Sequence, residues 1–220
     1  GKEEEKVYEQ ADLAKNYAAA RRVSWNVGDL TLSCKAGRMR ELIEEAAAEG
    51  RKILVFSFFL ETIESIAALL GDACCGPING SVPPQKRQQI VDEFDAAPPG
   101  SVLLAQVQSG GTGLNIQPAS VIVFCEPQIK PSIENQAISR AYRMGQLRSV
   151  MVHRLLCDNT VDERILELLR EKQDVFDSFA EESTVGSEYL RAEKSISAAI
   201  IEMEKERLNA GEIQLLPEKK

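Results

Sequence analysis

The chain alternates between short, almost continuously apolar runs and longer stretches with the spacing of amphipathic helices. Runs of the first kind are typical of strands that are covered on both faces, as in a parallel sheet. They lie at residues 52–58, 101–107, 120–125 and 149–156. Helical spacing occurs at residues 37–50, 61–71, 83–96, 133–146 and 160–182. This alternation predicts a three-layer α/β domain with a mainly parallel sheet.

The two ends of the chain have a different character. Residues 2–27 are charged and rich in alanine, and we expect them to be helical. A break rich in Ser, Thr and Gly begins at residue 183, and helical spacing returns over 187–210. The pattern therefore predicts three segments: a helical lead-in over 1–34, a core domain over 35–182 and a helical extension over 183–220.

The composition limits the kinds of partner to expect. The chain has 220 residues, of which 44% are hydrophobic, so it can bury a sizeable core. Its net charge is −8 and its pI is about 4.9. Since domains that bind nucleic acid usually carry a basic excess, such a role would need a local basic patch on an acidic body. No apolar run approaches the ~20 residues that span a bilayer, so we expect no membrane partner.

The five cysteines and the single histidine do not form a recognisable metal or redox motif. The cysteines are odd in number and have no CxxC spacing, which is typical of reduced cytosolic thiols: Cys34, Cys74, Cys75, Cys125 and Cys157. His153 lies in an apolar run. We therefore expect no metal site and no histidine-based catalytic triad.

The predicted helix over 133–146 has two contrasting stripes. Gln136, Arg140 and Arg143 fall on one of them by their spacing. The other is small and apolar: Ala137, Ile138 and Ala141. From spacing alone, a solvated basic face, or an ion pair with Glu126 or Glu134, explains the two guanidinium groups as readily as a functional role does.

A glycine-rich loop over 109–120 follows the second apolar run. Gly110, Gly111 and Gly113 resemble part of a dinucleotide-binding fingerprint, but Ile116 stands where the third glycine would be. The sequence also contains no P-loop motif. The loop is either a tight turn or a place where a phosphate or a substrate backbone approaches the end of a parallel strand.

Five motifs in succession resemble the second RecA-like lobe of Swi/Snf-type ATPases, superfamily 2 DNA translocases that include chromatin remodellers. They are ILVFSF, INGSVPPQKRQQIVDEF, LLAQVQSGGTGLNIQPASVIVFCEP, NQAISRAYRMGQ and TVDERILELLREK. The resemblance covers about residues 35–180. The phrase SGGTGLNIQPAS is most similar to bacterial members. The resemblance implies a RecA-like domain with flanking helices.

The resemblance also implies a role in ATP hydrolysis. In this family ATP with Mg²⁺ lies between two lobes, and the first lobe brings the P-loop and the Mg²⁺-binding Asp-Glu box. The second lobe would bring Arg140 and Arg143 across the cleft as arginine fingers. Gln136 would orient this motif or contact the nucleotide. Three residues of the glycine-rich loop would couple the nucleotide cleft to DNA: Gly111, Gly113 and Asn115.

A second implication is a DNA track along this lobe. Ser57 and the turn Asn79-Gly80-Ser81 match positions that contact a DNA phosphate backbone. Such contacts position a protein without reading sequence. Lys86 and Arg87 would add positive charge, although a solvated helix face explains them equally well.

Several positions depart from the family pattern. Phe58, Gln108, Ser109 and Tyr142 stand where many members have glutamine, a basic residue, alanine and histidine. The common Asp-Pro-x-Trp-Asn-Pro is Glu-Pro-Gln-Ile-Lys-Pro at 126–131. These changes affect how ATP hydrolysis would be coupled to DNA movement more than they affect the resemblance to the family.

We therefore expect the second lobe of an ATP-dependent duplex-DNA translocase or remodeller, excised from its first lobe and inactive without it. A non-catalytic module that binds nucleic acid or protein is the alternative, and an unrelated α/β sugar- or nucleotide-binding domain is a further one. We expect a cytoplasmic, nucleoid-associated location if the protein is bacterial and a nuclear one if it is eukaryotic.

Overall fold

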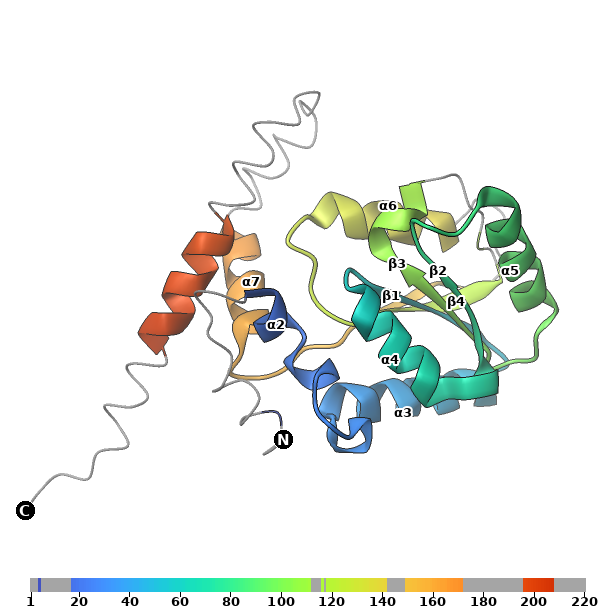
Figure 1. The fold of residues 1–220 in the computed structure, drawn as a ribbon, viewed down its shortest axis with the longest axis horizontal. Coiled ribbons are helices and arrows are strands. Elements are labelled where there is room, and N and C mark those ends of the chain that lie inside the picture. The colour runs from blue at the N-terminus through green and yellow to red at the C-terminus, as the bar shows by residue number, and fades with distance from the viewer. Residues whose placement is uncertain are drawn as a thin grey trace, which may run out of the picture.

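The centre of the molecule is a five-stranded, all-parallel sheet with strand order β2-β3-β1-β4-β5. The structure, a computed structural model, describes residues 4, 17–111, 116, 118–141, 149–171 and 196–207. The strands are β1 (Lys52–Ser57), β2 (Cys74–Ile78), β3 (Val102–Gln106), β4 (Ala119–Phe124) and β5 (Met151–Arg154). The three-layer α/β architecture predicted from the sequence is confirmed (Figure 1).

Helices cover both faces of this sheet. They are α3 (Cys34–Ala48), α4 (Leu60–Leu70), α5 (Pro84–Ala96) and α6 (Pro131–Ala141). Side chains of α3 and α4 pack on one face of the central strands, against Ile53 and Val55 of β1. Those of α5 and α6 pack on the other face, against Leu54 and Phe56. Alternate residues of β1 thus serve two cores, which explains why its sequence is apolar throughout.

A third apolar cluster joins helices that lie beside the sheet. It contains residues from α2 (Tyr17–Arg21), α7 (Val161–Glu171) and the helical residues 196–207: Ala20, Val161, Ile165, Leu168, Ile196 and Ile200. Figure 1 shows these three helices together at one side of the domain. Among the described residues, no helix is both long and apolar enough to cross a membrane.

Helix ends differ from the expectation in two places. The helix expected over 2–27 ends at Arg21 in its described part, and 3₁₀ turns follow at Val23–Trp25 and Leu30–Leu32. Helix α3 begins at Cys34, three residues before the expected start, because the Ser33 hydroxyl accepts a hydrogen bond from the Ala36 amide at 3.1 Å. The ranges expected for three other helices, 133–146, 160–182 and 187–210, lie partly outside the described residues.

The lead-in predicted over 1–34 shares its core with the sheet. Trp25 is buried among α3, α4 and the central strands, and its indole N–H donates to the Cys125 carbonyl at 3.2 Å. Arg21 Nη2 donates to the Pro127 carbonyl at 2.8 Å. These two bonds tie residues 17–33 to the end of β4, the edge at which the candidate site lies.

Candidate functional site

Several of the predicted site residues that the structure describes lie at the carboxyl edge of the sheet, because parallel strands all end at the same edge. Ser57 ends β1, and Gln106 ends β3. Asn79 follows β2, and Glu126 lies two residues after β4. Loops that follow neighbouring strands of the order β2-β3-β1-β4 therefore lie side by side.

Glu126 lies at the centre of this edge and is fully buried. Its carboxylate accepts hydrogen bonds from the Ser57 hydroxyl at 3.0 Å, the Phe58 amide at 2.6 Å and the Gln128 side-chain amide at 3.1 Å. Burial raises the pKa of Glu126, although the Arg21 charge and these hydrogen bonds oppose the rise. The Ser57 hydroxyl is thus occupied by Glu126, and the Ser57 side chain is fully buried, away from the surface where DNA would lie.

Two buried cations surround this acidic centre. Lys35 Nζ donates to the Cys125 carbonyl at 3.1 Å and pairs with Asp162 at 2.7 Å. Burial by itself would lower the pKa of Lys35, but the charge and hydrogen bond of Asp162, together with Cys157 and Glu126, outweigh burial and raise it, so Lys35 is a cation. Arg21 lies over the rings of Phe58 and Phe59, at 5.8 and 5.2 Å from their centroids.

The turn after β2 presents polar atoms to solvent. Asn79 Oδ1 accepts hydrogen bonds from the Ser81 amide at 3.0 Å and the Ser81 hydroxyl at 2.6 Å. Gly80 and Ser81 are exposed. Arg87 is only 6% exposed, and its guanidinium donates to the carbonyls of Asn79, Gly80 and Val82 at 2.6–3.2 Å. Arg87 therefore stabilises the turn through the hydrogen bonds of its buried guanidinium group.

Lys86 has the opposite environment to its neighbour. Its side chain is exposed on the first turns of α5, and Nζ donates to Gln89 Oε1 at 3.1 Å. Of the two basic residues expected on the DNA track, Lys86 is the one whose charge faces solvent.

The glycine-rich loop begins beside the turn after β2. The short 3₁₀ helix η4 (Val107–Gly111) includes Ser109, whose hydroxyl donates to Gln106 Oε1 at 3.2 Å. A Cβ atom on Gly80 would lie 3.9 Å from Ser109 Oγ, so this loop and the turn touch. Gly111 ends η4, whereas Gly113 and Asn115 lie outside the described residues.

Helix α6 brings Gln136 and Arg140 to the same edge. Gln136 is exposed, whereas Ala137 and Ala141 are buried against the sheet, as the two-stripe pattern predicts. The Ile116 amide in the glycine-rich loop donates to the Arg140 carbonyl at 3.3 Å. Arg143 lies outside the described residues.

The Arg140 side chain is half-buried, and its Nη1 has no hydrogen-bond partner among the described residues. Burial lowers the pKa of Arg140, yet a guanidinium group remains charged at neutral pH. The two acids that the sequence offered as ion-pair partners of this arginine, Glu126 and Glu134, have other partners. Glu134 pairs with Arg154 at 2.6 Å, and Glu126 is held by the network described above. The Arg140 guanidinium therefore has a buried, unpartnered donor atom among the described residues, on a helix that contacts η4.

Sequence reasoning identified Glu126 as a possible partner of Arg140 but not as the centre of the edge. A lone acid directly after a fully apolar strand was the available signal, because only a buried partner set stabilises it there. Lys35 and Arg21 gave no such signal, since each stands among many charged or polar residues.

Comparison with known proteins gives a consistent picture. The family model "Helicase conserved C-terminal domain" matches residues 34–145. An uncharacterized ATP-dependent helicase of Mycoplasma pneumoniae is 33% identical over 150 residues, which are 67% of this chain and 15% of that protein. The SNF2 domain-containing protein ENL1 of Oryza sativa subsp. japonica is 33% identical over 139 residues, 62% of this chain and 14% of that protein. The chain thus spans about a seventh of the length of these relatives.

Solved structures show the same fold. The Sulfolobus solfataricus SWI2/SNF2 ATPase core domain matches with a TM-score of 0.61 and 25% identity, over 86% of this chain and 40% of that one. The C-terminal part of the Fun30 ATPase domain matches with a TM-score of 0.63 and 20% identity, over 78% and 55%. The Sulfolobus core has also been solved in complex with dsDNA, and that structure matches with a TM-score of 0.58 and 24% identity, over 86% and 45%.

Proposed function

The chain belongs to the helicase conserved C-terminal domain family and is a C-terminal lobe of a Swi/Snf helicase-like ATPase, and from this premise we propose how its residues serve an ATP-dependent duplex-DNA translocase. The lobe supplies arginine fingers to a cleft shared with a first RecA-like lobe and forms part of a DNA track. The unpartnered Nη1 of Arg140, half-buried beside the glycine-rich loop, carries this proposal.

A buried donor without a partner costs about 1–3 kcal/mol. That cost favours a role in which the partner arrives with a ligand. A phosphate oxygen suits a guanidinium group, which is planar, always charged and able to donate two parallel hydrogen bonds. Arg140 would thus meet the γ-phosphoryl group as charge redistributes in the transition state, together with Arg143.

Gln136 and the glycine-rich loop have supporting roles in the proposal. Gln136 is exposed on the same helix as Arg140 and would orient the finger motif or contact nucleotide. The Ile116–Arg140 backbone hydrogen bond joins the loop to α6, so a movement of the loop would be transmitted to the helix that carries Arg140. Gly111, Gly113 and Asn115 would couple the cleft to the DNA track through this connection.

The DNA track in this proposal follows the turn after β2. Asn79, Gly80 and Ser81 offer solvent-facing polar groups, and Lys86 adds a positive charge nearby. Backbone N–H groups and small hydroxyls can bind phosphates without sequence preference. Ser57 and Arg87 are buried, so they would stabilise the segments that form the track rather than contact DNA themselves.

ATP and Mg²⁺ belong to the two-lobe protein in this proposal. The arginines present here fit the triphosphate, and the P-loop and Mg²⁺-binding carboxylates would come from the first lobe. The bound metal supplies charge neutralisation on the phosphates. This chain adds donors on the opposite side of the cleft.

The test is Arg140→Ala in the two-lobe protein, with DNA-stimulated ATPase activity, nucleotide affinity and thermal melting measured together. A finger that acts in the transition state predicts a fall in kcat of about 10³-fold or more with little change in ATP affinity. Arg140→Lys should recover little activity, because an ammonium group lacks the planar fork.

Arg38→Ala is the matched control, because Arg38 is exposed on α3 and, among the described residues, pairs with surface acids of its own helix, Glu41 and Glu45. It should leave turnover unchanged. Near-normal turnover in Arg140→Ala would overturn the finger assignment and favour a non-catalytic interaction module. Loss of the melting transition in that variant would instead make Arg140 a structural residue.

A further inference from the structure

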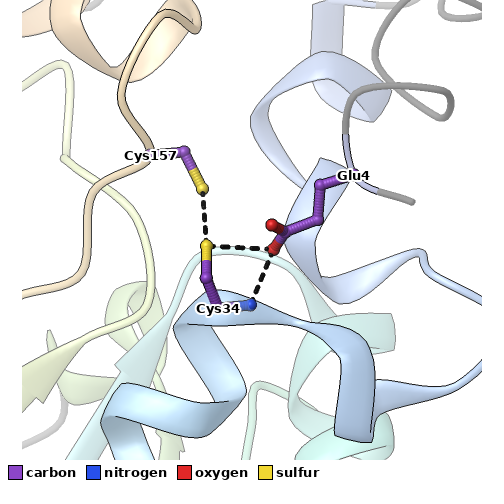
Figure 2. Close-up of side chains that lie close together, drawn as sticks. All are labelled: Glu4, Cys34 and Cys157. Carbon is purple, nitrogen blue, oxygen red and sulfur yellow. Dashed lines mark hydrogen bonds between the residues drawn. The ribbon is translucent and has the colours of Figure 1, made fainter. Parts of the chain in front are cut away.

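Two cysteines and a glutamate from distant parts of the chain meet on the side of the domain near α7. Cys34 is the first residue of α3, and Cys157 lies between β5 and α7. Cys34 Sγ lies 3.7 Å from Cys157 Sγ and donates to Glu4 Oε1 at 3.1 Å. Figure 2 shows the two thiols and the carboxylate pointing toward one another from three separate segments.

From this arrangement we propose that Glu4, Cys34 and Cys157 bind a Zn²⁺ ion. Their donor atoms all lie within 4.8 Å of one another. A tetrahedral Zn²⁺ with Zn–S bonds of about 2.3 Å holds its two sulfurs about 3.8 Å apart. The observed separation of 3.7 Å already matches this edge of the tetrahedron.

The carboxylate lies close to a ligand position. With a Zn–O bond of about 2.0 Å, the sulfur and oxygen ligands would lie about 3.5 Å apart. The observed Cys34–Glu4 distance is 3.1 Å, about 0.4 Å shorter than this, and Cys157 Sγ lies within 4.8 Å of the carboxylate oxygen. Glu4 is only 5% exposed, and the Cys34 amide also donates to its Oε1 at 2.9 Å, which fixes the carboxylate at the site.

The three donors line a cavity of about 660 Å³. Three protein ligands leave the fourth tetrahedral position open, and the cavity has room there for a water molecule. Soft thiolate ligands select Zn²⁺ over hard cations such as Mg²⁺ and Ca²⁺. Binding displaces one proton from each thiol, whereas Glu4 binds as the carboxylate.

The charges around the site suit the metal complex. Two thiolates, one carboxylate and Zn²⁺ carry a net charge of −1. The N-terminus of the 15-residue helix α3 favours negative charge, and the buried Lys35 ammonium lies beside Cys157. Arg38, Arg154 and Asp158 also line the cavity, and Asp162 balances Lys35.

A redox function of the same pair is less favoured. Burial raises the pKa of Cys157 to about 12, and burial together with Glu4 raises that of Cys34. Since the thiolate and not the thiol attacks in disulfide formation, these raised pKa values disfavour oxidation of the pair. A metal ion removes the protons by direct coordination, so it does not depend on free thiolate.

The first test uses Co²⁺ as a spectroscopic probe for Zn²⁺ in the reduced 220-residue chain. One equivalent of Co²⁺ should give a thiolate charge-transfer band and the strong visible absorption of a tetrahedral complex, and one equivalent of Zn²⁺ should remove both. Cys34→Ser and Cys157→Ser should each weaken Zn²⁺ binding more than about 100-fold, and Glu4→Gln about 10–100-fold. Cys74→Ser, outside the cluster, is the matched control and should leave binding unchanged.

The second test needs no variant, so it holds even if a serine substitution impairs folding. Alkylation of Cys34, which is exposed, should slow markedly when Zn²⁺ is added, while alkylation of Cys75, outside the cluster, should keep its rate. Absence of a stoichiometric Co²⁺ thiolate spectrum, or equal labelling of Cys34 with and without Zn²⁺, would overturn the proposal. So would loss of two protons from the intact mass with a Cys34–Cys157 disulfide in place of bound metal.

Discussion

Arg87 and Lys86 are adjacent basic residues that the sequence presents alike and the structure separates. The Arg87 guanidinium is buried against three carbonyls of the turn after β2, whereas the Lys86 ammonium faces solvent. Arg87 therefore stabilises the conformation of the turn, whereas Lys86 adds positive charge to the surface. The distinction depends on helix phase, because consecutive helical residues point about 100° apart.

Substitution of each residue should separate the two contributions. We expect Arg87→Ala to lower the free energy of unfolding by about 1–3 kcal/mol, because three carbonyls lose their donor. Lys86→Ala should change it by less than about 0.5 kcal/mol. In the two-lobe protein, Lys86→Ala should reduce the salt dependence of DNA binding by about one phosphate contact. Urea unfolding and DNA titrations at several salt concentrations measure both effects.

Arg87→Lys is the informative intermediate variant. It keeps the charge but cannot reach three carbonyls with a single ammonium group, so it should recover only part of the lost stability. Full recovery by lysine would show that charge alone matters at this position. An unchanged salt slope in Lys86→Ala would remove Lys86 from the track.

Burial of single polar residues is the part of the site that the sequence could not predict. Ser57 and Arg87 were expected to contact DNA, and both are buried by partners distant in the sequence or by the turn itself. The stripe of α6 that carries Gln136 and Arg140 was predictable, because it depends only on helical spacing. The cluster of Glu4, Cys34 and Cys157 was not, since separations of 30 and 123 residues match no ligand motif.

Among the elements, strands β1, β3, β4 and β5 were predicted, and β2 was not. The four predicted strands are apolar runs of the expected kind. Strand β2 has the sequence CCGPI, in which two of five residues are poor strand formers. Its position at the edge of the sheet tolerates the proline, since an edge strand needs fewer ladder hydrogen bonds.

The packing of α3 against the loop before β3 depends on Gly100. This glycine has φ = +84°, and a Cβ atom added to it would lie 2.7 Å from the Ala47 Cβ atom. We expect Gly100→Ala to lower the free energy of unfolding by about 1–3 kcal/mol, through backbone strain and overpacking. Urea unfolding of the purified chain measures the change.

Gly37→Ala is the matched control for this substitution. Gly37 lies inside α3, and an added Cβ atom would meet nothing within 4 Å. The same chemical change should therefore stabilise the protein by about 0.5–1 kcal/mol, because alanine favours the helix. A loss of stability in both variants would contradict the assignment of Gly100 to a position that only glycine fits.

For the whole molecule, the strand order places the polar turns of four neighbouring strands on one edge. That edge offers cations and backbone groups to a ligand, but the sequence contains no P-loop to hold the β- and γ-phosphates. Under the proposed function, the site is therefore half of a cleft. The complete reaction needs groups from the first lobe.

The chain by itself should accordingly release no phosphate from ATP, even with saturating duplex DNA, because it lacks a cradle for the triphosphate. It should bind duplexes of unrelated sequence weakly, with a log–log salt slope of roughly −0.9 for each phosphate contact. Phosphate-release assays and salt titrations on the purified chain check both results. Turnover that co-purifies with the chain and is lost in Arg140→Ala would contradict the half-cleft model.

The bonds from Arg21 and Trp25 to the end of β4 have a consequence for the order in which the protein folds. Their partners, Pro127 and Cys125, lie 106 and 100 residues further along the chain. During synthesis the segment that carries Arg21 and Trp25 emerges before β4, so these two hydrogen bonds cannot form until the residues that follow β4 have emerged. Contacts of such long sequence separation form late, since a long loop must close first. The segment that carries Arg21 and Trp25 thus completes its contacts late, after strand β4 has joined the sheet.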